Sequence, residues 1–254
     1  MNKIVELTGL TNEQFFTRHA APGRVALAGG TALIDRVICR AQRHVDEDEK
    51  WSCWSHAFLI QGPRLDGHTW VIESDLDLQR KHIRLGVQEN RITKYYDEQL
   101  YSSVAILDFG LTPQQVSAVL SGGLNLVADR TQYSIRELLG VLVAMRHQHL
   151  RGKSNLLSRD KSLFCSAMVH HLFQSAGIDL VPGLEVKHTT PEDVFRSTLP
   201  HTTYLLKREV ATSRLSKLRE KLEGRMEDFS DSCRDELTAL DLGSGSGHDS
   251  PSGG

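Results

Sequence analysis

A cysteine at the start of a predicted helix is the residue of this chain best suited to chemistry. Cys165 follows the polar, turn-like segment Arg159–Ser162 and precedes residues 166–176, which are apolar at helical spacing and stop at Gly177, a typical C-cap residue. A thiol in the first turn of a helix meets unpaired backbone N–H groups and the positive end of the helix dipole. Both favour the thiolate, which is the reactive form. The alternative interpretation is that Cys165 is a small buried hydrophobic residue.

A cysteine nucleophile needs a base that takes and returns its proton, and a polar group that orients the base. A predicted β-hairpin supplies both: residues 55–60 and 69–73 are apolar runs, and the connector 61–68 between them carries Gly-Pro and Asp-Gly turn signals. If the strands pair, Glu73 falls close to His56 and could hold one imidazole nitrogen while the other faces the thiol. Taken singly, His56 also suits a strand-end histidine bonded to backbone, and Glu73 a solvent-facing charge.

The overall composition suits a globular protein with one substantial core and an appendage. The 254 residues are 39% hydrophobic and 24% charged, with a net charge of -2 and no pooled basic region, so we expect no nucleic-acid partner. The four cysteines lack CxxC spacing, which argues against a zinc ribbon or a disulfide framework, and neighbouring histidines on a helix cannot chelate together. We expect no metal and no cofactor.

The chain shows neither a membrane-spanning run nor a secretory signal. No apolar run approaches the ~20 residues that cross a bilayer, and the segment that begins at Met1 lacks the long apolar stretch of a signal peptide. We therefore expect synthesis in the cytoplasm, without a Sec signal peptide, and any export through a dedicated secretion system.

The elements around these residues predict an α+β fold in which an antiparallel sheet packs against the cysteine-bearing helix. Further strands are expected at 25–28 and 103–108, helices at 32–38 with Thr31 as N-cap and from Thr112 and Ser134, and a solvated loop at 46–50. A long charged amphipathic helix is expected from Tyr204 to Leu240, interrupted at Gly224. Residues 243–254 are Gly/Ser-rich, which is typical of a disordered tail or a linker scar.

The ordered set of motifs resembles a known family, the circularly permuted papain-like hydrolases of the NlpC superfamily, in their YiiX/YaeF-like branch. The lecithin:retinol acyltransferases are distant relatives with the same order, in which the histidine strand precedes the cysteine helix. The matching segments are Gly23–Ala26, Trp54–Ala57, Trp70–Ser74, Gly86-Val87, Gln132–Ser134 and Phe164–Val169. The resemblance implies a permuted papain-like catalytic domain at 22–200, after a lead-in at 1–21 and before a helical extension at 201–241 and a disordered tail at 242–254.

The resemblance also implies roles for single residues. Cys165 would be the nucleophile, His56 the general base and then acid, and Glu73 the residue that orients His56. Acyltransferase relatives carry a histidine at the third position, so His68 is a rival to Glu73. Tyr133 is a candidate oxyanion donor by family position, although a packed tyrosine is an equal alternative. Many relatives have an acidic residue two positions after the cysteine, where this chain has Ala167.

The expected activity is that of a cysteine hydrolase or acyltransferase that works through a thioacyl-enzyme intermediate. The apolar residues Trp51, Trp54 and Phe164 near the motifs favour a lipid ester substrate, as in a phospholipase. An amidase that cuts peptidoglycan or peptide amides is the alternative, since both reactions use the same intermediate. A non-catalytic binding module is a second alternative, in which the terminal helix docks a partner or a membrane surface. The family's use in bacterial competition implies a toxin or effector role with an inhibitor (immunity) protein as partner.

Overall fold

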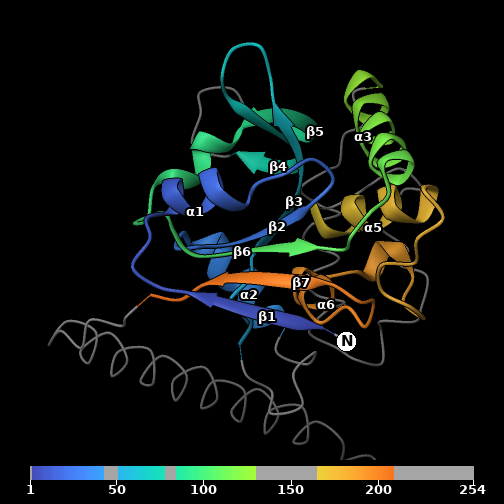
Figure 1. Cartoon of the computed structure of the whole chain (residues 1–254). Coiled ribbons are helices and arrows are strands. Elements are labelled where there is room, and N and C mark those ends of the chain that lie inside the picture. Colours follow the sequence, from blue (N-terminus) through green and yellow to red (C-terminus); the bar gives the residue numbers. More distant parts are fainter. Residues whose placement is uncertain (1, 43–50, 78–83, 130–164, 209–254) are drawn as a thin grey trace, which may run out of the picture. The chain divides into compact units, whose positions relative to one another are not determined.

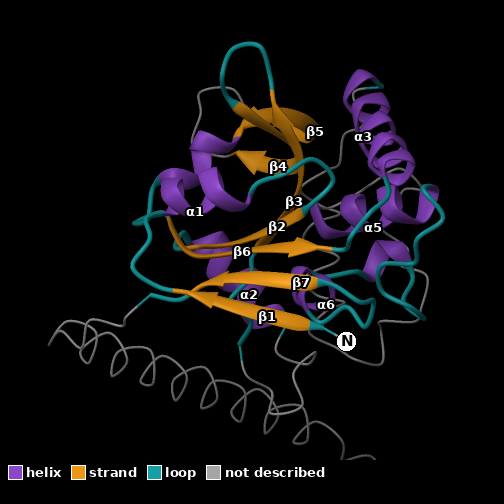
Figure 2. Ribbon diagram, viewed as in Figure 1, coloured by secondary structure: helices purple, strands orange, loops and turns teal. Residues whose placement is uncertain are grey.

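The computed structural model describes residues 2–42, 51–77, 84–129 and 165–208, and it shows an α+β fold (Figures 1 and 2). The described strands form one mixed seven-stranded sheet in the order β1-β7-β6-β2-β3-β4-β5. The pair β1–β7 is parallel, and the other five pairs are antiparallel. The strands are β1 (Lys3–Leu7), β2 (Val25–Gly30), β3 (His56–Pro63), β4 (Thr69–Asp77), β5 (Arg84–Arg91), β6 (Tyr101–Asp108) and β7 (Thr202–Leu206).

The described helices begin where the local sequence offers caps. Thr11 and Thr112 each form a capping box with a glutamine three residues later, and Pro113 occupies the first helical turn, as predicted for that helix. Thr31, the predicted cap of the second helix, instead donates its hydroxyl to Gln99 O, and Ala32 takes the N-cap position. The helices are α1 (Asn12–His19), α2 (Leu33–Ala41), η2 (Ile92–Tyr96), α3 (Pro113–Ala128), α5 (Cys165–Ser175), η4 (Val186–His188) and α6 (Pro191–Phe195).

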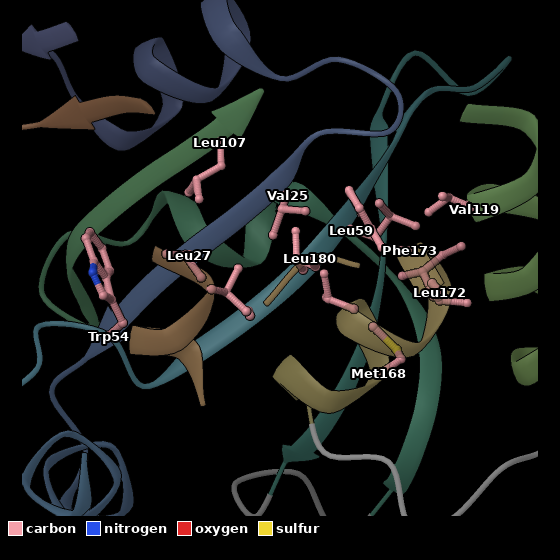
Figure 3. Packing of buried hydrophobic residues seen from close by; sticks show 14 of the residues in the cluster. Val25, Leu27, Trp54, Leu59, Leu107, Val119, Met168, Leu172, Phe173 and Leu180 are labelled. Atoms are coloured by element: carbon pink, nitrogen blue, oxygen red, sulfur yellow. The ribbon is translucent and has the colours of Figure 1, made fainter. Parts of the chain in front are cut away.

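Each face of the sheet carries its own buried cluster, because successive side chains of a strand point to opposite faces. On one face, Met168 and Leu172 of α5 and Val119 of α3 pack against the sheet, and Figure 3 shows these side chains around Leu59 of β3. On the other face, α1 and η2 pack against Phe58, the next residue back along β3. The centre of the sheet is therefore buried on both sides. Successive side chains of β3 and β4 face alternately α5 on one side of the sheet and η2 on the other.

The two strands of the β3–β4 hairpin separate near the start of β3. Their pairing runs from Pro63↔Thr69 to Leu59↔Ile72, with a register shift between Ile60 and Gly62. His56 and Ala57 of β3, and Glu73 of β4, lie beyond the last pair, while β4 continues in register with β5. This parting leaves backbone groups at the start of β3 available to the first turn of α5.

The strands predicted at 25–28, 55–60, 69–73 and 103–108, and the hairpin between the second and third, are confirmed. The helix predicted from Tyr204 is wrong at its start, because residues 202–206 form β7 between β1 and β6. Residues 209–240 of that helix, the tail, the loop at 46–50 and the helix from Ser134 lie outside the described residues. The lead-in contributes β1 and α1. In the part of the chain that the structure describes, no helix is both long and apolar enough to span a bilayer.

Candidate active site

Cys165 is the first residue of α5, as the sequence predicts, and α5 ends at Ser175 just before Gly177, which has a positive φ of 79°. The cysteine is half-buried. Its sulfur accepts hydrogen bonds from the backbone N–H groups of Ser166, in the same helical turn, and of Ala57, in the parted stretch of β3. The helix is held in place by its apolar face and by Ser166 Oγ, which donates to Thr189 O at 2.7 Å. The sulfur therefore meets the donors that a thiolate requires.

The imidazole of His56 lies between the Cys165 sulfur and the Glu73 carboxylate. A side-chain hydrogen bond joins His56 and Cys165, and His56 Nε2 lies 2.8 Å from Glu73 Oε2. The His56 side chain is 14% exposed and the Glu73 side chain is 0% exposed. Three residues from α5, β3 and β4 thus form one connected chain of polar contacts. Because Nε2 is engaged by the carboxylate, Nδ1 is the ring nitrogen left to exchange a proton with sulfur.

Among the described residues Glu73 has four polar partners, of which the sequence indicated His56 alone. Its Oε1 accepts from Asn90 Nδ2 at 2.6 Å and from Lys94 Nζ at 3.2 Å. Its Oε2 accepts from the Tyr95 hydroxyl as well as contacting His56. A buried carboxylate needs such donors to stay charged. Asn90 stands two positions from the direct partner of Glu73 on β5, so a prediction of that strand and its register would have found it.

The three groups shift one another's proton affinities. Burial lowers the pKa of His56, but the Cys165 sulfur and the Glu73 carboxylate outweigh burial and raise the pKa to about 10. Burial raises the pKa of the Cys165 thiol, but the His56 charge and the donors around the sulfur outweigh burial and bring the pKa below the ordinary thiol value. Burial also opposes ionisation of Glu73, yet Lys94, His56 and Tyr95 bring its pKa far below the ordinary value. Each shift thus favours the charged form of its group: thiolate, imidazolium and carboxylate.

The other cysteines of the described chain have the opposite electrostatic character. Burial, with the Asp35 carboxylate as the next cause, raises the pKa of Cys39 to about 12. Burial, followed by Glu192, raises the pKa of Cys53, although Cys53 is exposed. Among the described cysteines, Cys165 is thus the one whose surroundings favour the reactive form.

The remaining predicted residues lie elsewhere. His68 lies in the turn between β3 and β4, where its backbone N–H donates to Asp66 Oδ1 at 3.1 Å, so it is Glu73 that contacts His56. Trp54 is 3% exposed and packs 5.2 Å from the Phe195 ring, which makes it a core residue. Trp51 is 41% exposed. Tyr133 and Phe164 lie outside the described residues.

The described residues contain no group of three or more histidine, cysteine, aspartate or glutamate side chains that could hold a metal ion. His170, one of the paired histidines on α5, is buried and serves the packing of that helix. Its Nδ1 lies 2.7 Å from Thr189 Oγ1, and its Nε2 lies 3.2 Å from Asp179 Oδ1.

Comparison with known proteins finds solved structures of similar outline. No protein-family model matches the chain. No curated protein matches it significantly. The crystal structure of the metalloprotein yiiX from Escherichia coli O157:H7 is similar over 72% of this chain and 94% of its own, with 12% sequence identity and a TM-score of 0.47. A similarity at that TM-score and identity does not indicate a shared activity.

Proposed function

We propose that the protein is a cysteine hydrolase with a permuted papain-like arrangement, in which Cys165 is the nucleophile, His56 the general base and acid, and Glu73 the residue that orients His56. The observation that carries the proposal is the connected chain of sulfur, imidazole and carboxylate, with the sulfur in the first turn of α5. A nucleophile, a base within hydrogen-bonding reach and a third group that holds the base are the parts that covalent acyl transfer needs.

In the first half of the reaction, the Cys165 thiolate attacks the acyl carbon of an ester or amide. A C–S bond forms and the carbonyl electron pair moves to oxygen. The backbone N–H of Cys165 is suited to hold that oxyanion, because the first N–H groups of a helix have no intrahelical partner. When the oxyanion collapses, the bond to the leaving group breaks, and the His56 imidazolium gives its proton to the leaving oxygen or nitrogen.

In the second half, neutral His56 takes a proton from water or an acceptor alcohol, whose oxygen attacks the thioacyl carbon. The C–S bond then breaks, which releases the acyl product and restores the thiolate. Glu73 remains a carboxylate throughout and stabilises the imidazolium in each half-reaction.

The proposed substrate is a lipid ester, and a peptide or peptidoglycan amide is the competing class. Exposed apolar side chains on α2 and before β3 support an apolar acyl group: Leu33 is 79% exposed, Val37 44% and Trp51 41%. Purified protein is expected to release free fatty acid from phospholipid vesicles, and fragment release from purified cell wall would instead favour the amidase.

A labelling experiment tests the nucleophile without any knowledge of the substrate. Iodoacetamide at pH 6.5 should modify Cys165 at least about tenfold faster than Cys53, because only the thiolate reacts. Peptide mass spectrometry measures the two rates. Cys53 is the matched control, since it is exposed but its pKa is raised. Cys165→Ala should abolish hydrolysis, whereas Cys53→Ala should not. Faster labelling of Cys53, or full activity of Cys165→Ala, would refute the proposal.

A further inference from the structure

Tyr95 of η2 contacts the same carboxylate oxygen that holds His56. Its side chain is fully buried, and its hydroxyl donates to Glu73 Oε2. That oxygen also lies 2.8 Å from His56 Nε2. Asn90 Nδ2 donates to the other oxygen, Oε1, at 2.6 Å. With donors on both oxygens, the carboxylate is restrained in rotation about its terminal bond as well as in position.

The Tyr95 ring is itself firmly held. It stacks on Phe58 with ring centroids 4.2 Å apart and planes 9° apart, and it lies 6.2 Å from the His56 ring at 20°. Its backbone carbonyl accepts from the amide of Asn12 at 2.9 Å, and Asn12 is fully buried in the first turn of α1. The hydroxyl is therefore presented to Glu73 by a rigid ring on a tethered backbone.

We propose that Tyr95 is a positioning residue whose hydroxyl, with the Asn90 amide on the other oxygen, holds the Glu73 carboxylate in the orientation that contacts His56. This inference rests on the proposed function, because positioning matters only if His56 and Cys165 act together. Tyr95 is placed to act through Glu73 and His56, while the reacting atoms belong to Cys165 and the substrate.

The charges around Glu73 determine the direction of the expected effect. Glu73 faces His56 from β3, Asn90 from β5, and Lys94 and Tyr95 from η2, with Cys165 of α5 beyond His56. Without the tyrosine hydroxyl, a buried carboxylate binds a proton more readily, and His56 then loses its counter-charge. If Glu73 stays ionised, its negative charge is no longer offset by the Tyr95 hydroxyl, and the charge disfavours the thiolate more strongly. Both effects make the thiolate harder to form, so both move its appearance to higher pH.

The test is the pH dependence of Cys165 alkylation in the full chain, for the wild type and for Tyr95→Phe. The substitution keeps the stacked ring and removes only the hydroxyl. The rising limb of the plot of alkylation rate against pH is expected to move to higher pH by about one unit, because hydrogen bonds to charged groups are stronger than those between neutral groups. Tyr96→Phe is the matched control: Tyr96 belongs to the same helical turn, but its hydroxyl is hydrogen-bonded to Thr17. Its limb should coincide with that of the wild type.

A second variant protects the test against a folding defect. Asn90→Asp replaces a donor with a like charge beside Glu73 Oε1 and nearly conserves shape, so its limb should move in the same direction. An unchanged limb in a Tyr95→Phe protein with a normal thermal melt overturns the inference and leaves the proposed function intact. If Tyr95→Phe fails to fold, an unchanged limb in Asn90→Asp overturns it. A wild-type Cys165 that labels no faster than Cys53 overturns the proposed function, and this inference with it.

Discussion

Replacement of Glu73 by glutamine is the sharpest test of the electrostatics of the site. Glu73→Gln keeps the volume of the side chain and removes its charge, and His56 then keeps Cys165 as its only ionisable partner among the contacts described above. The pKa of His56 is raised to about 10 in the wild type, in part by Glu73. Hydrogen bonds to charged groups are worth about 1.5–3 kcal/mol, which corresponds to a fall of about 1–2 pKa units. His56 in the variant should therefore titrate at about pH 8–9.

The direct assay is an NMR titration of the His56 ring in both proteins, which requires no substrate. Because the pKa of His56 is raised by folding, its stabilising contribution is complete below about pH 6.5 and is lost as the pH rises through about 10. The difference in the free energy of unfolding between the wild type and Glu73→Gln should accordingly become smaller as the pH approaches about 10. The rate of hydrolysis at neutral pH should fall about ten- to a hundredfold, from the same free energy.

Glu89→Gln is the matched control for charge removal. Glu89 lies on β5 opposite Ile72, the neighbour of Glu73, and it pairs with Arg64. Its replacement should leave the titration of His56 unchanged. An identical His56 midpoint in Glu73→Gln and the wild type would refute the view that the carboxylate raises the proton affinity of the ring.

Two further predictions concern how the fold supports the site. Gly29→Ala would place a Cβ 2.0 Å from the backbone oxygen of Cys53. The substitution should therefore lower the free energy of unfolding by about 1–3 kcal/mol and slow the alkylation of Cys165. An unchanged urea midpoint would contradict this prediction. Asn12→Ala removes the amide that donates to the carbonyls of Tyr95 and Tyr101, which should cost about 2 kcal/mol or more. Thr11→Ala, which removes only the adjacent helix cap, should cost about 1 kcal/mol, and an equal loss in both variants would count against a special role of Asn12.

Several features could be predicted from the sequence because they depend on neighbours along the chain. The turn residues between β3 and β4 predict the hairpin, and Thr112 with Pro113 predicts the start of α3. The position of Cys165 at the start of α5 follows from helical periodicity that ends at Gly177. The hairpin then implies that Glu73 approaches His56, and the structure shows that contact. The catalytic roles of these residues stay predictions.

Long-range pairing explains where the sequence was misleading. The Leu-, Lys- and Glu-rich run that follows Tyr204 favours a helix, and by local pattern alone that helix extends back to Tyr204. Residues 202–206 instead pair with β1 and β6, which lie about 200 and 100 positions earlier in the chain. A local pattern contains no information about such partners, and sheet pairing overrides local helical preference.

The sequence by itself therefore determined the nucleophile candidate, the base candidate and the local elements that carry them, because caps, turns and periodicity act over a few residues. Only the tertiary structure decided that Asn90, Lys94 and Tyr95 surround Glu73, and that Ala57 donates to the Cys165 sulfur. Those contacts depend on the register of β5 against β4, on the packing of η2 and on the parting of β3 from β4. The physical reason is that burial and charge depend on how the chain packs, and they determine proton affinities.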